Sequence, residues 1–401
     1  MSERVFITGT GIICAIGNTT QVVLESIRQS KHGIGFPTFL NTIHQFDFPV
    51  GEVKYSNNEL YDLVQPKKKT NLSRTALLGM IAAKEALKNA GIENISEFRT
   101  GLISATTVGG MDKTEIFFPS FINNPNSGRL RNIITHDCGD STEQIAEHLG
   151  IKDYITTIST ACSSSANAIM LGARLIKNNI LDRVVVGGTD ALTKFTLNGF
   201  NSLMILDKSH CRPFDETRNG LNLGEGAGFV ILESEKSIKI NNKNIICELK
   251  GYGNACDAFH QTASSPDGYG ACLAISKAFE TSGLNPEDID YINAHGTGTP
   301  NNDLTEGKAI EKIFGNKDPM FSSTKSYTGH TLAASGGIEA VFSCLAIQHQ
   351  LIFPNLNFSN QMKELEISPV NTLIHNKPVR NVLSNSFGFG GNNTTLIFSK
   401  Y

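Results

Sequence analysis

Short runs rich in β-branched residues alternate with stretches of helical periodicity from one end of the chain to the other, and this alternation narrows the possible folds more than any other feature. Strands that alternate with helices favour a largely parallel sheet layered with helices. We therefore expect an α/β protein. The clearest strand patterns lie at residues 5–9, 101–107, 154–159, 182–188 and 289–296.

Two helices can be predicted in more detail. The stretch that begins at Ser73 has apolar residues at helical spacing and stops at Gly91, and glycine commonly follows the last turn of a helix. Ser141 and Gln144 have the spacing of a capping box, which predicts that another helix begins at Ser141.

The length of the chain allows one large α/β unit or two domains. With 401 residues, of which 40 % are hydrophobic, the chain can bury a large core. The polar stretch 234–244 lies between two strand patterns and is the best candidate boundary. We therefore predict an N-terminal half, residues 1–238, and a C-terminal half, residues 239–401. The order of strands and helices is broadly alike in the two halves.

Charge and cysteine content exclude several classes of function. A net charge of −3 gives no overall field for nucleic acid or an anionic membrane, so an acidic partner needs a local basic patch. The eight cysteines show no Cys-x-x-Cys spacing, and the N-terminus has no pattern of a signal segment. No apolar run approaches the ~18 residues that cross a bilayer. We expect a reduced, cytoplasmic protein without a membrane span, and we assign no metal ligands.

One cysteine lies in a position suited to a nucleophile. In "TISTACSSSANAI", residues 157–169, a strand that ends near Ser159, a tight turn and a following helix would bring the Cys162 thiol to a helix N-terminus. The helix dipole and the free N–H groups favour a thiolate there. Cysteine also packs as a small buried hydrophobe, so the residue alone does not decide between nucleophile and core.

Two histidines and a glycine-rich turn add to this pattern. His295 stands where an apolar strand breaks into a Gly/Thr loop, and His330 follows Lys325 by five residues. A lone histidine is usually structural, but two imidazoles and a cysteine at such junctions suit covalent acyl chemistry. The glycine-rich residues 388–391 can offer backbone N–H groups to an oxyanion, and they lack the spacing of a phosphate loop.

Five motifs together resemble the elongating β-ketoacyl-acyl carrier protein synthases, the condensing enzymes of fatty acid and polyketide assembly. They are "TACSSSANA", "FDETRNGLNLGEGAG", "HGTGTPNND", "KSYTGHTLAASGG" and "NSFGFGGNN". The resemblance implies a thiolase-like fold of two similar halves in five layers, α-β-α-β-α, and usually a homodimer. It implies decarboxylative condensation of a cysteine-bound acyl chain with malonyl-acyl carrier protein. No cofactor is then bound by the enzyme, because the phosphopantetheine arm of the carrier protein holds the substrates.

The resemblance also assigns roles to the reactive residues. Cys162 matches the nucleophile that takes the acyl chain. His295 and His330 match the paired histidines that bind the malonyl thioester and promote loss of CO₂, and Lys325 matches the lysine beside them. The backbone N–H groups of Cys162 and Phe389 match the oxyanion hole, and the Phe389 ring matches a gating aromatic.

Further residues are implied around these groups. Asp303 and Glu339 match acidic residues that support the site. Thr297 and Thr299 match contacts to phosphopantetheine, whose amides can bind a pair of hydroxyls. Val108, Met111 and Phe200 match residues that line the wall of the acyl pocket in the family.

A basic patch is expected for the partner. Carrier proteins are small and acidic, so a synthase with a net charge of −3 needs local positive charge to attract one. Two stretches, residues 65–74 and 128–131, resemble the basic segments of elongating synthases. In that family these segments lie beside the mouth of the tunnel that leads to the active site. The docking residues predicted from them are Lys67, Lys68, Lys69, Arg74, Arg129 and Arg131.

Departures from the family pattern and alternative functions remain open. Asn392 stands where threonine is commoner, and Gly298 where housekeeping members often have serine, which leaves room for a specialised pathway. The runner-up function is a non-condensing partner subunit of the chain-length-factor type, which lacks the cysteine that this chain has at Cys162. A second enzyme alternative is the initiating synthase or thiolase branch, but the initiating branch pairs its cysteine with a His and an Asn rather than with two histidines. A pure carrier-binding module would not need these reactive side chains.

Overall fold

The computed structural model describes residues 3–66, 71–241, 243–315, 317 and 319–401. Within these residues, one ten-stranded sheet has the order β3-β2-β4-β5-β1-β6-β12-β11-β7-β8, and a second sheet pairs β9 with β10. The strands are β1 (Val5–Cys14), β2 (Thr100–Ala105), β3 (Tyr154–Ile158), β4 (Arg183–Asp190), β5 (Gly226–Ser234), β6 (Cys247–Cys256), β7 (Tyr291–Asn293), β8 (Phe321–Ser322), β9 (Leu351–Ile352), β10 (Ile374–His375), β11 (Asn381–Gly388) and β12 (Asn392–Ser399).

The large sheet consists of two halves with the same strand order. The first half runs β3-β2-β4-β5-β1, and the second half repeats it as β8-β7-β11-β12-β6. The halves meet where β1 pairs antiparallel with β6, through Phe6 opposite Glu248 and Ile7 opposite Cys247. This internal repeat agrees with the similar element order that the sequence indicates in the two halves.

The expectation of a largely parallel sheet was wrong for its centre. β2 pairs parallel with β3 and β4, and β7 pairs parallel with β8 and β11. The five pairings from β4 through β5, β1, β6 and β12 to β11 are antiparallel. For the pair β11–β12 the reason is the short turn Phe389–Gly391, because so short a connection can join only antiparallel neighbours.

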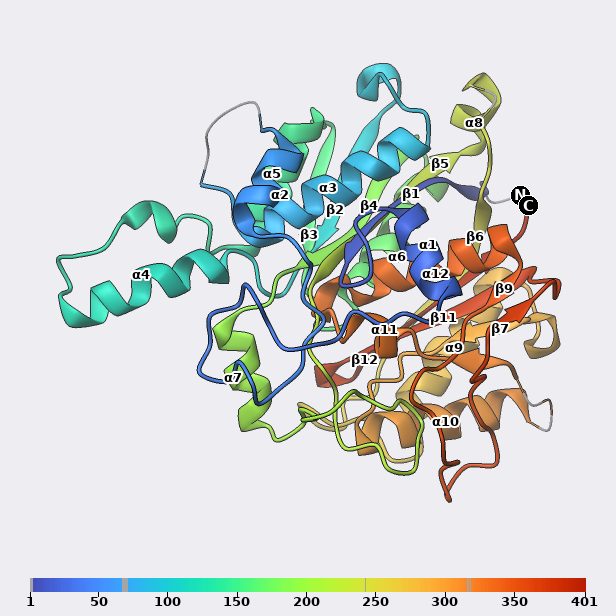
Figure 1. The fold of residues 1–401 in the computed structure, drawn as a ribbon. Coiled ribbons are helices and arrows are strands. Elements are labelled where there is room, and N and C mark those ends of the chain that lie inside the picture. The colour runs from blue at the N-terminus through green and yellow to red at the C-terminus, as the bar shows by residue number, and fades with distance from the viewer. Residues whose placement is uncertain (1–2, 67–70, 242, 316, 318) are drawn as a thin grey trace.

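Helices cover both halves and fill the space between them (Figure 1). The middle layer holds α6 and α12, which pack on strands of the first half and of the second half. α3 covers the outer face of β1 and β5, and α9 covers β6 and β12. The helices are α1 (Thr20–Arg28), α2 (Asn57–Val64), α3 (Arg74–Asn89), α4 (Met111–Asn123), α5 (Cys138–Leu149), α6 (Ser164–Lys177), α7 (Lys194–Ser202), α8 (Glu235–Asn241), α9 (Tyr269–Ser282), α10 (Pro300–Phe314), α11 (Lys325–Thr328) and α12 (Ser335–His349).

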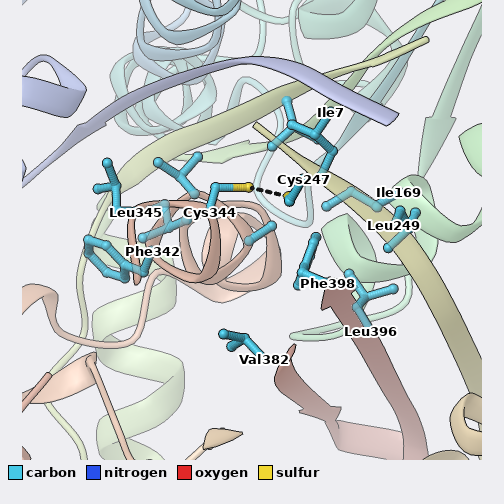
Figure 2. Close-up of a cluster of buried hydrophobic side chains, with 14 of the residues drawn as sticks. Ile7, Ile169, Cys247, Leu249, Phe342, Cys344, Leu345, Val382, Leu396 and Phe398 are labelled. Carbon is cyan, nitrogen blue, oxygen red and sulfur yellow. Dashed lines mark hydrogen bonds between the residues drawn. The ribbon is translucent and has the colours of Figure 1, made fainter. Parts of the chain in front are cut away.

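These five layers confirm the predicted thiolase-like architecture. α12 is buried from Ser335 to Ile347, as expected for a helix between two sheet layers. Its contact with the sheet is apolar and includes two thiols: Cys344 Sγ lies 3.7 Å from Cys247 Sγ of β6, among Ile7, Leu249 and Phe398 (Figure 2). All eight cysteines are free thiols.

The predicted helix ends agree only in part. Ser73 caps α3 by accepting a hydrogen bond from the N–H of Ala76, and Gly91 follows the last turn with φ +60°. The prediction that a helix begins at Ser141 was wrong. α5 begins at Cys138, because the Asp137 carboxylate accepts the N–H of Gly139 and offers an earlier cap.

Three further predictions concern the whole chain. The predicted boundary at residue 238 falls within α8, and the division into two domains stays a prediction. In the described part of the chain, no helix is long and apolar enough for a membrane span. The same residues contain no group of three or more His, Cys, Asp or Glu arranged to hold a metal ion.

Candidate active site

The candidate nucleophile lies in a tight turn between β3 and α6. Ala161 has a left-handed backbone with φ +53°, which is strained for a residue with a side chain and turns the chain sharply into the helix. Cys162 follows it, 5 % exposed, just before the first turn of α6. The cysteine therefore has the position at a helix N-terminus that the sequence predicts.

His330 contacts the thiol directly. Its Nε2 lies 3.1 Å from the Cys162 sulfur. The backbone N–H of Leu332 donates to His330 Nδ1 at 3.2 Å, so Nδ1 is the acceptor nitrogen and the ring hydrogen is on Nε2. Burial, and then the charge of Lys325, lower the His330 pKa well below its usual value, so the ring is neutral at neutral pH.

His295 is held in the same tautomer by Lys325. The Lys325 ammonium donates to His295 Nδ1 at 3.2 Å, to the His295 carbonyl at 2.6 Å and to the Glu339 carboxylate. Burial, Lys325 and His330 lower the His295 pKa well below its usual value. The two imidazole rings lie edge to face with their centres 5.3 Å apart. The site thus holds two neutral rings with hydrogen on Nε2.

Carboxylates behind these rings fix the loops that carry them. Asp303 is fully buried and accepts the N–H groups of Thr297 and Gly298, so it fixes the loop after His295. Glu339 bonds the Lys325 ammonium, and burial raises the Glu339 pKa to about 6 despite that charge.

Two buried acids of the site were missed by the sequence analysis. Glu306, one turn after Asp303 on α10, accepts the backbone N–H of His295 at 2.8 Å, and burial raises its pKa to about 7. Asp190 at the end of β4 accepts the N–H groups of Val108 and Ala333. The spacing of Asp303 and Glu306 on one helix face was a usable signal for Glu306, whereas no local signal marks Asp190.

The motif "FDETRNGLNLGEGAG" supports the second histidine through its backbone. The Asn222 carbonyl accepts the His330 N–H at 2.7 Å, and the Gly224 N–H donates to the His330 carbonyl at 2.9 Å. These backbone hydrogen bonds connect the motif to the loop that carries His330.

The glycine-rich turn brings a backbone donor to the thiol. A Cβ on Gly388 would lie 3.0 Å from the Thr160 carbonyl oxygen and 3.1 Å from the Cys162 nitrogen, so β11 approaches the turn at residues 160–162 closely here. The Phe389 backbone N–H consequently lies near the Cys162 sulfur, where it acts to lower the pKa of the thiol. Burial raises the Cys162 pKa to about 11, while Lys325 and this N–H act in the opposite direction.

Two cavities meet at Cys162. The larger has a volume of about 350 Å³ and is lined by His295, His330, Thr297 and Thr299, whose hydroxyls lie 2.8 Å apart. The smaller, about 220 Å³, is lined by the predicted wall residues Val108, Met111 and Phe200. Phe200 and Phe389 line both cavities and stack with ring centres 5.8 Å apart. The structure thus brings together all the residues that the sequence predicts for catalysis and substrate binding, and their roles stay predictions.

One predicted docking residue is corrected. Arg74 is 7 % exposed and forms a bidentate ion pair with Glu225, at 2.6 and 2.8 Å. It therefore stabilises the start of α3 and does not face a partner protein. Arg129 and Arg131 are exposed. The predicted docking residues Lys67, Lys68 and Lys69 lie outside the described residues.

Comparison with known proteins identifies the family. The model of the beta-ketoacyl synthase N-terminal domain matches residues 2–237, and that of the C-terminal domain matches residues 246–359. The chain belongs to the β-ketoacyl synthase family. This membership confirms the resemblance that the five motifs indicate.

Relatives cover the whole chain. The 3-oxoacyl-(acyl-carrier-protein) synthase 2 of Synechocystis sp. is 37 % identical over 415 residues, which cover 100 % of this chain and 98 % of the relative. The protein of the same name from Staphylococcus aureus is 34 % identical over 412 residues, covering 100 % and 99 %. A solved structure of the ishigamide ketosynthase/chain length factor superposes with a TM-score of 0.94 at 30 % identity and covers 100 % of both chains.

Proposed function

We propose that the chain is a condensing acyltransferase, which joins an acyl group on Cys162 to malonyl-acyl carrier protein and releases CO₂ and 3-oxoacyl-acyl carrier protein. The observation that carries this proposal is the 3.1 Å contact between Cys162 Sγ and His330 Nε2, beside the His295 ring, where two cavities meet. A nucleophile, two N–H donors and space on both sides are what this reaction requires. The names of the curated relatives support the proposal.

In the first half-reaction, the Cys162 thiolate attacks the carbonyl carbon of an acyl thioester on the carrier protein. The new C–S bond forms on Cys162 and the bond to the carrier's sulfur breaks. The carrier leaves as a thiolate and takes up the proton that the Cys162 thiol lost, so that it ends as a thiol. Negative charge passes through the thioester oxygen during the transfer. The N–H groups of Cys162 and Phe389 stabilise that charge.

In the second half-reaction, His295 and His330 bind the thioester oxygen of malonyl-acyl carrier protein through Nε2–H. Loss of CO₂ puts negative charge on this oxygen, and the two donors stabilise the enolate as it forms. The enolate carbon then attacks the acyl carbonyl on Cys162, so that a C–C bond forms and the C–S bond breaks. None of these steps needs a cofactor held by the chain.

The two cavities serve different parts of the substrates. The larger one, with the Thr297 and Thr299 hydroxyls, receives the phosphopantetheine arm, whose amides bind the hydroxyls. The smaller one receives the acyl chain against Val108, Met111 and Phe200, which set its length. The Phe389 ring stands between the two cavities and gates the passage.

Docking of the acidic carrier protein is assigned to the two basic stretches. The Asn71 side chain, which directly follows the lysine-rich segment, donates to the Arg131 carbonyl at 2.7 Å. Asn71 and Arg131 are therefore in contact, although 60 residues separate them in sequence. Arg129 and Arg131 supply positive charge that attracts the carrier, and the sequence alone suggests the same role for Lys67, Lys68 and Lys69.

A second subunit and a cytoplasmic setting complete the proposal. α4 extends from the body of the molecule (Figure 1) and exposes Ile116, Phe118 and Ile122, an apolar surface suited to a further synthase subunit, identical or related. The free state of all eight cysteines fits the reducing cytoplasm.

The alternative is a non-condensing partner subunit, and it draws support from the structural relative described as a ketosynthase/chain length factor. Cys162 argues against it, since such a partner has no use for a thiol in contact with His330. Condensation therefore remains the preferred function.

The test is product formation from purified acyl-acyl carrier protein and malonyl-acyl carrier protein, followed by mass spectrometry. The wild-type chain is expected to form 3-oxoacyl-acyl carrier protein, and Cys162→Ala to form none. Cys14→Ala is the matched control, because Cys14 is a buried thiol that lines neither described cavity. Equal rates in wild type and Cys162→Ala would rule out the covalent mechanism.

A further inference from the structure

Asn392, one of the two departures from the common family pattern, is an acceptor for three donors beside the nucleophile. Its side-chain oxygen accepts the Ser163 hydroxyl at 2.7 Å, Asn167 Nδ2 at 2.8 Å and Asn254 Nδ2 at 2.9 Å. An amide oxygen has two lone pairs, so three donors occupy its acceptor capacity fully. This set of four polar side chains is not used by the mechanism described above.

The donors come from the elements that build the active site. Ser163 directly follows Cys162, and Asn167 lies one turn further along α6. Asn254 is on β6, and its amide nitrogen also donates to Thr394 on β12 at 2.9 Å. Through one oxygen, Asn392 therefore connects the cysteine turn, the middle-layer helix and the second half of the sheet.

Asn392 also closes the turn that carries the backbone donor. In the antiparallel pair of β11 and β12, Asn392 lies opposite Gly388. Gly388 is the residue whose backbone packs against Thr160 and Cys162, and Phe389 follows it. A shift of Asn392 away from Ser163 is thus transmitted by the strand pairing to the Phe389 N–H.

We propose that Asn392 is a positioning residue for acyl transfer, which holds the Phe389 N–H against the Cys162 sulfur by tying the start of β12 to Ser163. This proposal rests on the proposed function for its acyl-transfer readout. The histidines are fixed by other groups, namely Lys325, Glu306 and the Asn222 carbonyl. Loss of the Asn392 oxygen should therefore affect acylation of Cys162 and spare decarboxylation of malonyl-acyl carrier protein.

The experiment compares Asn392→Ala, Ser163→Ala and the double variant. When the Asn392 oxygen is removed, its donors keep other partners, because Ser163 also donates to the Thr160 carbonyl and Asn167 to the Thr160 hydroxyl. The fold is therefore expected to persist. Thermal unfolding checks this. Asn178→Ala is the matched control, because Asn178 bonds the backbone at the far end of α6. Acylation of Cys162 is followed by intact mass and decarboxylation by CO₂ release.

Asn392→Ala should slow acylation by about tenfold or more, part of the loss caused by removing an oxyanion donor, and change decarboxylation by less than about twofold. The double variant should be no slower than Asn392→Ala, because both changes break one connection. The proposal would be overturned if Asn392→Ala slowed both half-reactions equally or left acylation unchanged. It would also be overturned if the rate losses of the two single variants multiplied in the double variant.

Failure of the proposed function gives a different result. If wild type takes no acyl group from a carrier protein, alkylation of Cys162 by iodoacetamide still tests the positioning. Asn392→Ala should then react at least about threefold more slowly than wild type, since the sulfur loses a well-aimed N–H donor. An equal alkylation rate would overturn the positioning role independently.

Discussion

At the scale of single residues, the state of the Cys162 thiol follows from burial. Desolvation of the anion raises its pKa to about 11, and the Lys325 charge and the Phe389 N–H offset only part of this effect. At neutral pH the resting enzyme therefore holds a protonated thiol beside a neutral His330. The reactive thiolate is a minor species.

Alkylation of Cys162 should consequently depend steeply on pH. Because the pKa is raised, the thiolate fraction is small below pH 9 and grows about tenfold for each pH unit. The rate of iodoacetamide addition at Cys162, measured by intact mass with Cys162→Ala as background, should rise with that slope between pH 7 and pH 9. A plateau below pH 8 would instead indicate a preformed thiolate.

Residue patterns predicted which candidate reacting groups lie together, but only some of the residues that hold them in place. Cys162, His295, Lys325 and His330 were recognised because each stands in a distinctive local motif. Asp190 was missed because its partners, the N–H groups of Val108 and Ala333, come from segments remote in sequence. Arg74 was misassigned because its partner, Glu225, is 151 residues away and no local pattern shows the pair.

At the scale of elements, the start of α5 depends on Asp137. Its carboxylate accepts the Gly139 N–H, whereas the Ser141 hydroxyl only donates to the Cys138 carbonyl inside the helix. Replacement of Asp137 by alanine should lower the free energy of unfolding by about 1 kcal/mol. Ser141→Ala should cost clearly less. Urea unfolding of the two variants measures the difference, and a larger loss for Ser141→Ala would restore the capping box as the helix start.

Strand and helix positions could be predicted from periodicity, but strand direction could not. The patterns at 101–107 and 182–188 became the parallel neighbours β2 and β4. Strand periodicity is the same in both kinds of sheet, so only the connections distinguish them. The short turn after β11 carried that information, and its glycines were interpreted as an oxyanion feature alone.

At the scale of the whole molecule, docking should be electrostatic. Arg129 and Arg131 are exposed in a chain of net charge −3, so their reversal to glutamate removes local attraction for an acidic carrier protein. Association should slow by about tenfold at low salt and become less salt-dependent. Stopped-flow binding measures both quantities.

The matched control reverses Lys88 and Lys239, two exposed lysines, and changes the net charge equally. Alkylation of Cys162 by iodoacetamide should be unchanged in both double variants. If the Lys88/Lys239 variant slows association as much as the Arg129/Arg131 variant, net charge rather than a local patch governs docking.

The central claim is that one site performs two separable half-reactions, and a single-turnover measurement on His295→Ala tests it most directly. His295 lies beside His330 and bonds Lys325, whereas the Cys162 sulfur contacts His330 Nε2. With acyl-acyl carrier protein, wild type and His295→Ala should both gain the acyl mass on Cys162. After addition of malonyl-acyl carrier protein, wild type should lose that mass and release CO₂, while the variant should stay acylated about 10²-fold longer. Absence of acyl-Cys162 in wild type, or an equal loss of acylation and discharge in the variant, would contradict the account.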